Sequence, residues 1–207
     1  MSNPDSIVYV VDDDASVRDS MSSLLRSVGL RAEVFASTED FLGARRREIP
    51  GCLVLDVRLP GMTGLELQGE MGRTGIGIPI VFVTGHGDIP MVSRAMKAGA
   101  VEFLTKPFQR QELLAAIRQA LDRDRARREQ ERKLSALRSR FEKLTSRQRE
   151  VLHFVVGGFT SKEIAAELGL SEITIKVHRS QMMQKMGADT LASLVQLAGK
   201  LGIHSDC

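Results

Sequence analysis

The chain has 207 residues, 43% of them hydrophobic and 27% charged, which is typical of a globular protein with one large domain or two small ones. Its apolar runs fall short of the roughly 18–20 residues that cross a bilayer, and its start lacks a secretory apolar core, so we expect a cytoplasmic protein without membrane contact. Two cysteines and four scattered histidines exclude a disulfide framework and a structural zinc site.

The net charge of +3 is divided unevenly along the chain. Residues 1–121 carry 13 Lys and Arg against 15 Asp and Glu, whereas residues 122–207 carry 16 against 11. An acidic first part joined to a basic second part indicates two domains, of which the second meets a polyanion. We expect a first domain over 1–121, a charged helical linker over 122–141 and a second domain over 142–207.

Short apolar runs alternate with amphipathic stretches in the first domain. Most runs are short and continuous, as in a strand buried on both faces of a parallel sheet, whereas residues 32–35 include Glu33 and suit an edge strand. The stretches between the runs have helical periodicity. This alternation predicts an α/β domain with a five-stranded, doubly wound parallel sheet. The predicted strands are residues 7–11, 32–35, 53–55, 78–83 and 101–104.

Polar residues stand just beyond the carboxyl ends of four of these strands, namely Asp12 with Asp13, Asp56, Thr84 and Lys106. Ligands bind at that edge of an open parallel sheet. Clustered carboxylates suit Mg²⁺, with Mn²⁺ as an alternative, and a carboxylate can also accept a phosphoryl group. A lysine and a threonine would then stabilise the transferred charge. The alternative is that such aspartates only cap the following helices.

Four segments of this domain resemble the receiver domain of two-component response regulators over residues 5–122: Val10–Asp14, Leu55–Gly64, Val83–His86 and Phe103–Phe108. The resemblance implies that Asp56 is the phosphoacceptor. It further implies that Asp13, Asp56 and the backbone carbonyl of Arg58 hold Mg²⁺, while Asp12 orients a metal-bound water.

The same resemblance assigns roles at the ends of the last two strands. Thr84 and Lys106 would contact the phosphoryl oxygens, Phe103 would be an aromatic switch, and the Lys106–Pro107 peptide would be cis. The helix around residues 91–97 would form a dimer contact. Arg58 and His86 would either tune dephosphorylation or belong to a solvated rim.

The segment from residue 109 to 141 has a helical pattern and is heavily charged between 122 and 140. This favours a solvated helical linker over a short coiled coil, because too few heptads are apolar.

The last segment predicts a small all-α domain of four helices. The first begins near Thr145, Ser161 and Ser171 are expected to cap the second and third, and the fourth runs from Thr190 to Leu201. Two helices joined by a tight turn at Gly169 are typical of a helix-turn-helix.

The segments Leu144–Leu152 and Ser161–His178 resemble the LuxR-type DNA-binding domain, over residues 142–200. The resemblance implies that the last helix pairs with its twin on double-stranded DNA, and that His178 has either a phosphate contact or a structural role. The implied base contacts are Lys176, Val177 and Ser180, and the implied phosphate contacts are Lys162, Thr174, His178, Arg179 and Lys185.

Together the two parts resemble the FixJ/NarL class, and its FixJ-like and StyR-like members in particular. This implies a phosphorylation-activated transcriptional activator whose partners are a sensor histidine kinase, double-stranded DNA, a second copy of the chain and RNA polymerase. Its only chemistry would be Mg²⁺-dependent phosphotransfer to its own aspartate and autodephosphorylation. Two alternatives are a haloacid-dehalogenase-like phosphatase, disfavoured by Arg58 at the position of its second acid, and a receiver kept only as a dimerisation scaffold.

Overall fold

The computed structural model describes residues 6–85 and 87–204. The chain forms two compact units, Met1–Arg128 and Glu129–Cys207, and each has its own hydrophobic core. The division between them falls inside the segment expected to be a linker, so the limits 1–121, 122–141 and 142–207 stay predictions. Among the described residues, no helix combines the length and the apolar character that a membrane span requires.

As predicted, the first unit is an α/β domain around a five-stranded parallel sheet. The strand order in this sheet is β2-β1-β3-β4-β5. Its strands are β1 (Ile7–Val11), β2 (Arg31–Phe35), β3 (Gly51–Leu55), β4 (Ile80–Thr84) and β5 (Glu102–Thr105). Its helices are α1 (Ala15–Ser27), α2 (Thr38–Gly43), α3 (Gly64–Thr74), α4 (Ile89–Lys97) and the first part of α5 (Arg110–Glu142).

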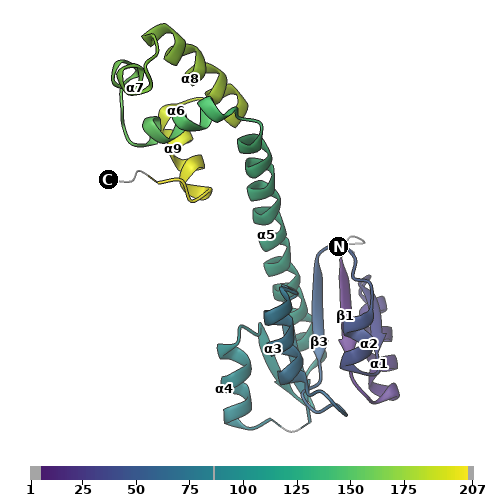
Figure 1. Cartoon of the computed structure of the whole chain (residues 1–207). Helices are drawn as coiled ribbons and strands as arrows, with labels where there is room; N and C mark the ends of the chain where they lie inside the picture. Colours follow the sequence, from purple (N-terminus) through teal and green to yellow (C-terminus); the bar gives the residue numbers. More distant parts are fainter. Residues whose placement is uncertain (1–5, 86, 205–207) are drawn as a thin grey trace. The chain divides into compact units, whose positions relative to one another are not determined.

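Both faces of the sheet are covered by helices, which explains the continuous apolar runs in the sequence. In β1, Ile7, Tyr9 and Val11 pack toward α2, α3 and α4, whereas Val8 and Val10 pack toward α1 and α5. Figure 1 shows α3 and α4 beside the strands of this unit. Because the helices occupy the two faces, the carboxyl edge of the sheet is left to the loops that carry the polar residues.

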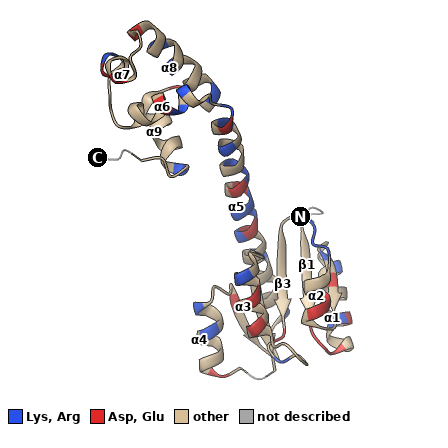
Figure 2. Cartoon of the chain, in the orientation of Figure 1, with Lys and Arg blue, Asp and Glu red and all other residues tan. Residues whose placement is uncertain are grey.

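Helix α5 has 33 residues and continues without interruption from the first unit into the second. Its first turns bury Leu113, Ile117 and Leu121 against the sheet, and its later turns carry charges of both signs (Figure 2). The expectation of a solvated linker is not met at Asp124. Its side chain is fully buried and accepts a hydrogen bond from the backbone N–H of Gly51.

The second unit is helical, as predicted, and contains α6 (Ser146–Val156), α7 (Ser161–Leu168), α8 (Glu172–Met186) and α9 (Leu191–Lys200). Ser171 is the N-cap expected for α8, and Thr145 caps α6, which begins where it was expected. The prediction that Ser161 caps α7 is wrong by one residue. Thr160 accepts from the N–H of Glu163, and the Glu163 carboxylate accepts from the N–H of Thr160, which is a reciprocal capping box.

Candidate functional sites

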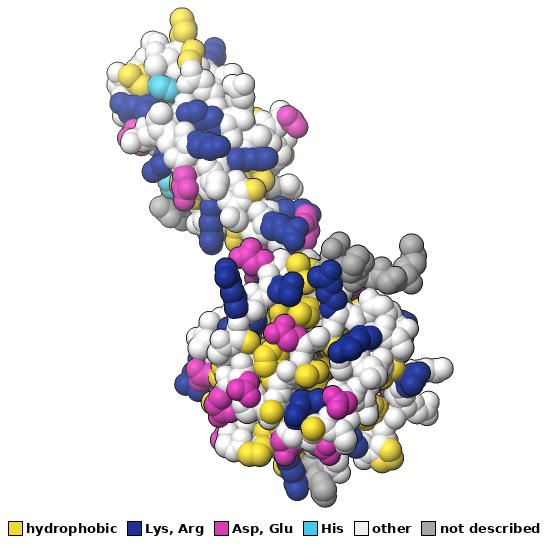
Figure 3. All heavy atoms as spheres, turned by 90° about the vertical axis from the view of Figure 1, so that its right-hand side faces the viewer, with side chains coloured by type: hydrophobic (Ala, Val, Ile, Leu, Met, Phe, Trp, Pro, Cys, Tyr) yellow, Lys and Arg dark blue, Asp and Glu magenta, His cyan; other side chains and the backbone are white. Residues whose placement is uncertain are grey.

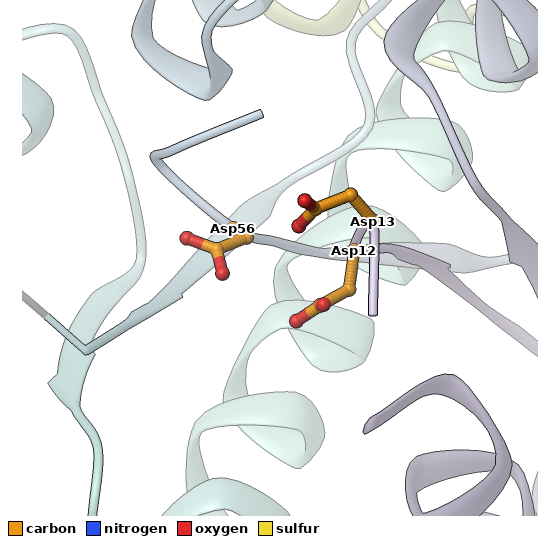
Figure 4. Close-up of side chains that lie close together, drawn as sticks. All are labelled: Asp12, Asp13 and Asp56. Carbon is orange, nitrogen blue, oxygen red and sulfur yellow. The ribbon is translucent and has the colours of Figure 1, made fainter. Parts of the chain in front are cut away.

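Three carboxylates meet at the carboxyl edge of the sheet. One oxygen from each of Asp12, Asp13 and Asp56 lies within 4.8 Å of the others, and Figure 4 shows the three side chains gathered there. Asp12 and Asp13 follow β1, Asp56 follows β3, and these two strands are neighbours in the sheet. The expected convergence of the acidic residues is therefore confirmed.

Hydrogen bonds from the backbone fix the two buried carboxylates. The Asp14 N–H donates to Asp12 Oδ1 and the Arg58 N–H donates to Asp56 Oδ1, each at 3.0 Å. The guanidinium of Arg18 donates to the carbonyls of Asp12 and Asp13 at 2.8 and 2.9 Å, which holds the loop after β1 in place. The alternative capping role belongs to Asp14, which accepts from the Ser16 N–H.

Lys106 places a positive charge directly against two of these carboxylates. Its Nζ lies 2.9 Å from Asp12 Oδ2 and 3.2 Å from Asp56 Oδ2. Partial burial opposes its charge, but the hydrogen bond to Asp12 and the charge of Asp56 outweigh that effect, so the pKa of Lys106 lies above its ordinary value. The expected cis peptide between Lys106 and Pro107 is confirmed.

Thr84 and Phe103 lie on the two strands beside this cluster. Thr84 is buried at the end of β4, and its carbonyl accepts from the Lys106 N–H at 2.7 Å. The half-buried Phe103 ring packs against Phe82 with centroids 5.8 Å apart. A Cβ at Gly87 would lie 2.8 Å from the Phe103 ring, so the loop after β4 packs closely on it. Arg58 is exposed, and His86 lies outside the described residues.

The donor set of the cluster fits a small divalent cation. All three side chains offer carboxylate oxygens, which are ligands that Mg²⁺ and Mn²⁺ prefer. The backbone at Gly64 lies so close to the backbone of Asp56 that a Cβ at Gly64 would collide with the Asp56 carbonyl oxygen. This explains the glycine at the start of α3 and keeps the loop after Asp56 tight against the site.

The second unit contains a helix-turn-helix made of α7, a turn at Gly169 and α8. Gly169 has a φ of +63° and ends α7, a conformation that glycine adopts readily. Helix α8 packs into the core of this unit with the side chains of Ile175, Met182 and Met186. Figure 3 shows Lys and Arg side chains distributed over this unit. The expected DNA-contact residues that are exposed are Lys162, Lys176, Val177, Ser180 and Lys185.

Several of the expected DNA contacts already have partners within the chain. Lys176 pairs with Glu172 at 2.8 Å, and Lys185 donates to the Lys143 carbonyl and to Gln148 Oε1. The half-buried Arg179 and Thr174 bond to Ser161 and Ser171 respectively. Lys185 therefore links α8 to the start of α6 by hydrogen bonds, beside its predicted contact with a DNA phosphate.

His178 is half-buried, and its Nδ1 is buried without a hydrogen-bond partner among the described residues. A buried ring nitrogen without a partner is uncommon in folded proteins. The burial agrees with a structural role for the ring, and the phosphate contact of His178 stays a prediction.

Two residues were missed in the sequence analysis. Asp124 was included in the charged linker, because no periodic signal separates one buried acid from its exposed neighbours. Ile173 was omitted from the outward face of α8, although its helical position relative to Val177 and Ser180 would have placed it there.

Family models match both parts of the chain. The response regulator receiver domain matches residues 8–118, and the LuxR family of bacterial regulatory proteins matches residues 142–198.

Full-length relatives cover nearly the whole chain. Nodulation protein W of Bradyrhizobium diazoefficiens is 51% identical over 97% of this chain and 88% of its own length. Transcriptional regulatory protein FixJ of Azorhizobium caulinodans is 41% identical over 97% of this chain and 95% of its own. The structure of the response regulator StyR aligns with a TM-score of 0.86 at 50% identity, covering 95% of this chain and 99% of that one.

Proposed function

The chain belongs to the two-component response regulators of the FixJ/NarL class, which join a receiver to a LuxR-type DNA-binding domain, and we propose that phosphorylation of Asp56 controls its action on DNA. As a transcriptional regulator, it acts on double-stranded DNA and answers to a sensor kinase. The observation that carries the proposal is the convergence of Asp12, Asp13 and Asp56 around Lys106 at one sheet edge.

The proposed phosphoryl acceptor is Asp56, as the resemblance to receiver domains implies. An oxygen of Asp56 forms a bond to phosphorus while the bond from phosphorus to the kinase histidine breaks, so the phosphoryl group moves without an oxidant or a further reactant. Lys106, whose Nζ lies 3.2 Å from Asp56, offers its charge to the incoming oxygens. Autodephosphorylation by water returns Asp56 to its free form, and no other turnover is proposed.

Asp13, Asp56 and the backbone carbonyl of Arg58 would hold Mg²⁺, with Asp12 orienting a bound water. The cation, which Mn²⁺ could replace, would neutralise charge on the phosphoryl oxygens when bound. The chain's own residues prepare that site, since the backbone N–H groups of Asp14 and Arg58 orient the two buried carboxylates.

Phosphorylation adds about −1.5 to −2 charge and new acceptor oxygens beside Thr84 and Lys106. Thr84 would move toward those oxygens, and Phe103, which packs against Phe82 and over Gly87, would turn inward. This movement shifts the loop after β4 and the surface of α4 toward the conformation that forms a dimer. Phosphorylation therefore acts on DNA binding through the oligomeric state.

On DNA, α8 enters the major groove of each half-site. Lys176, Val177 and Ser180 meet base edges, and α9 pairs with its twin. The dimer activates transcription through RNA polymerase in the cytoplasm. The proposed phosphate contacts are Lys162, Thr174, His178, Arg179 and Lys185.

Phosphoryl labelling tests the assignment of the acceptor. A kinase domain carrying a radioactive phosphoryl group on histidine should label the full chain in Mg²⁺ and leave Asp56→Asn unlabelled. Asp40→Asn, at an exposed aspartate of α2, is the matched control and should be labelled like the wild type. Label on folded Asp56→Asn would overturn the assignment, and an unlabelled wild type would favour the scaffold alternative.

A further inference from the structure

Ile173 is an exposed hydrophobic residue in the first turn of α8. The residue is 75% exposed, compared with 48% for Val177 one turn later. Neighbouring hydrogen bonds fix this turn, since Ser171 accepts from the Thr174 N–H and its hydroxyl contacts the Thr174 hydroxyl. An exposed isoleucine therefore stands in the capped first turn of a helix that lies within the match to the LuxR family model.

Helix geometry places Ile173 opposite the core. With about 3.6 residues per turn, Ile173 lies roughly half a turn away from the buried Ile175 and Met182. Val177 and Ser180 follow it at the spacings that keep residues on one face of a helix. Ile173, Val177 and Ser180 thus form one outward stripe, in which Ile173 is the residue nearest the N-terminus.

The surroundings of this stripe are charged. Exposed Lys176 lies beside it, and exposed Lys162 lies on the preceding helix. Cationic groups near the exposed apolar residues Ile173 and Val177 suit a ligand that carries both phosphates and apolar groups. In the major groove, the apolar group on base edges is the thymine methyl.

We propose that Ile173 is a specificity-determining residue that contacts the 5-methyl group of a thymine in each half-site. The inference rests on the proposed DNA binding by α8 and adds a base contact to it. Residues near the N-terminus of a recognition helix are the ones that reach base edges, which is where Ile173 stands. The competing explanation is that Ile173 is an exposed apolar residue without a function, as occurs on many protein surfaces.

The test replaces thymine by uracil, which removes only the methyl group and leaves base pairing unchanged. Preferred duplexes are first selected from a random library with the full chain, Mg²⁺ and beryllofluoride. Each thymine is then replaced in turn, and affinities are measured for the wild type and for Ile173→Ala. Ile173→Val tests partial retention of the contact, and Val34→Ala, an exposed residue of β2, is the matched control.

For the wild type, uracil at one position of each half-site should weaken binding about threefold to fourfold, as expected for one buried methyl group. Ile173→Ala should bind thymine and uracil duplexes equally at that position and keep the wild-type response elsewhere, while Val34→Ala should keep every response. An unchanged thymine preference in folded Ile173→Ala would overturn the contact. Failure of the wild type to select any duplex would instead overturn the proposed DNA binding, and the contact with it.

Discussion

The carboxylate of Asp124 in α5 accepts a hydrogen bond from the backbone N–H of Gly51 at the start of β3, at 2.9 Å. The same carboxylate is paired with Arg127 and Arg128 at 2.6 and 2.7 Å. It is fully buried, while both guanidinium groups reach the surface. This hydrogen bond joins α5 to the amino end of β3, whereas Asp56 follows the carboxyl end of the same strand.

Replacing Asp124 should therefore destabilise the first unit. Asp124→Ala leaves the Gly51 N–H without its acceptor, and we expect a loss of about 1–3 kcal/mol in the free energy of unfolding. Asp122→Ala is the matched control, because Asp122 pairs with Arg125 on the same helix but is 72% exposed; it should change stability by less than about 0.5 kcal/mol. Urea unfolding followed by circular dichroism measures both. Equal effects would show that the Gly51 contact adds nothing to stability.

The raised pKa of Lys106 predicts a dependence of stability on alkaline pH. The contribution of protonated Lys106 to the free energy of unfolding is fully present below the ordinary lysine pKa of about 10.4. It is lost as the pH rises through the higher pKa of the folded state. Between about pH 10 and 12 the wild type should lose more stability than Lys106→Met does. Lys97→Met, at an exposed lysine of α4, should lose stability with pH as steeply as the wild type does. Identical slopes for Lys106→Met and the wild type would contradict the ion pairs.

The cap of α7 can be tested by two adjacent substitutions. Thr160→Ala removes the acceptor of the Glu163 N–H and should cost about 1 kcal/mol of stability in the second unit. Ser161→Ala leaves the capping box intact and should cost less, since Ser161 Oγ accepts from the guanidinium of Arg179 and caps no helix N–H among the described residues. Thermal unfolding of the two variants compares them directly, and a larger loss for Ser161→Ala would restore the cap expected from the sequence.

Lys176 provides a test of base recognition by α8. If it contacts a base edge, Lys176→Ala should weaken binding by about 1–3 kcal/mol and relax the preference at one base pair. Lys133→Ala is the matched control, because Lys133 is also exposed and also pairs with a glutamate one turn earlier on its helix. Binding measured on the selected duplex and its single base-pair variants distinguishes the roles. Equal weakening on every sequence would mark Lys176 as a phosphate contact.

The sheet and its acidic edge could be predicted because both follow from local patterns. Continuous apolar runs predicted strands buried on both faces, and a polar residue directly after a strand must lie at the carboxyl edge. Asp124 could not be found in this way, since its burial depends on Gly51, which lies 73 residues away in the sequence. The cap of α7 was misplaced because Thr160 and Ser161 are both good capping residues. Only the partner, Glu163, distinguishes them, through its spacing of three residues from Thr160.

We propose that a phosphoryl group on Asp56 switches the chain from monomer to dimer. Sedimentation of the full chain in Mg²⁺, with and without beryllofluoride as phosphoryl mimic, measures this switch. We expect a shift from monomer to dimer on adding the mimic, and no shift for Asp56→Asn. A wild type that binds the mimic and stays monomeric would overturn the proposed switch, as would an equal shift in Asp56→Asn.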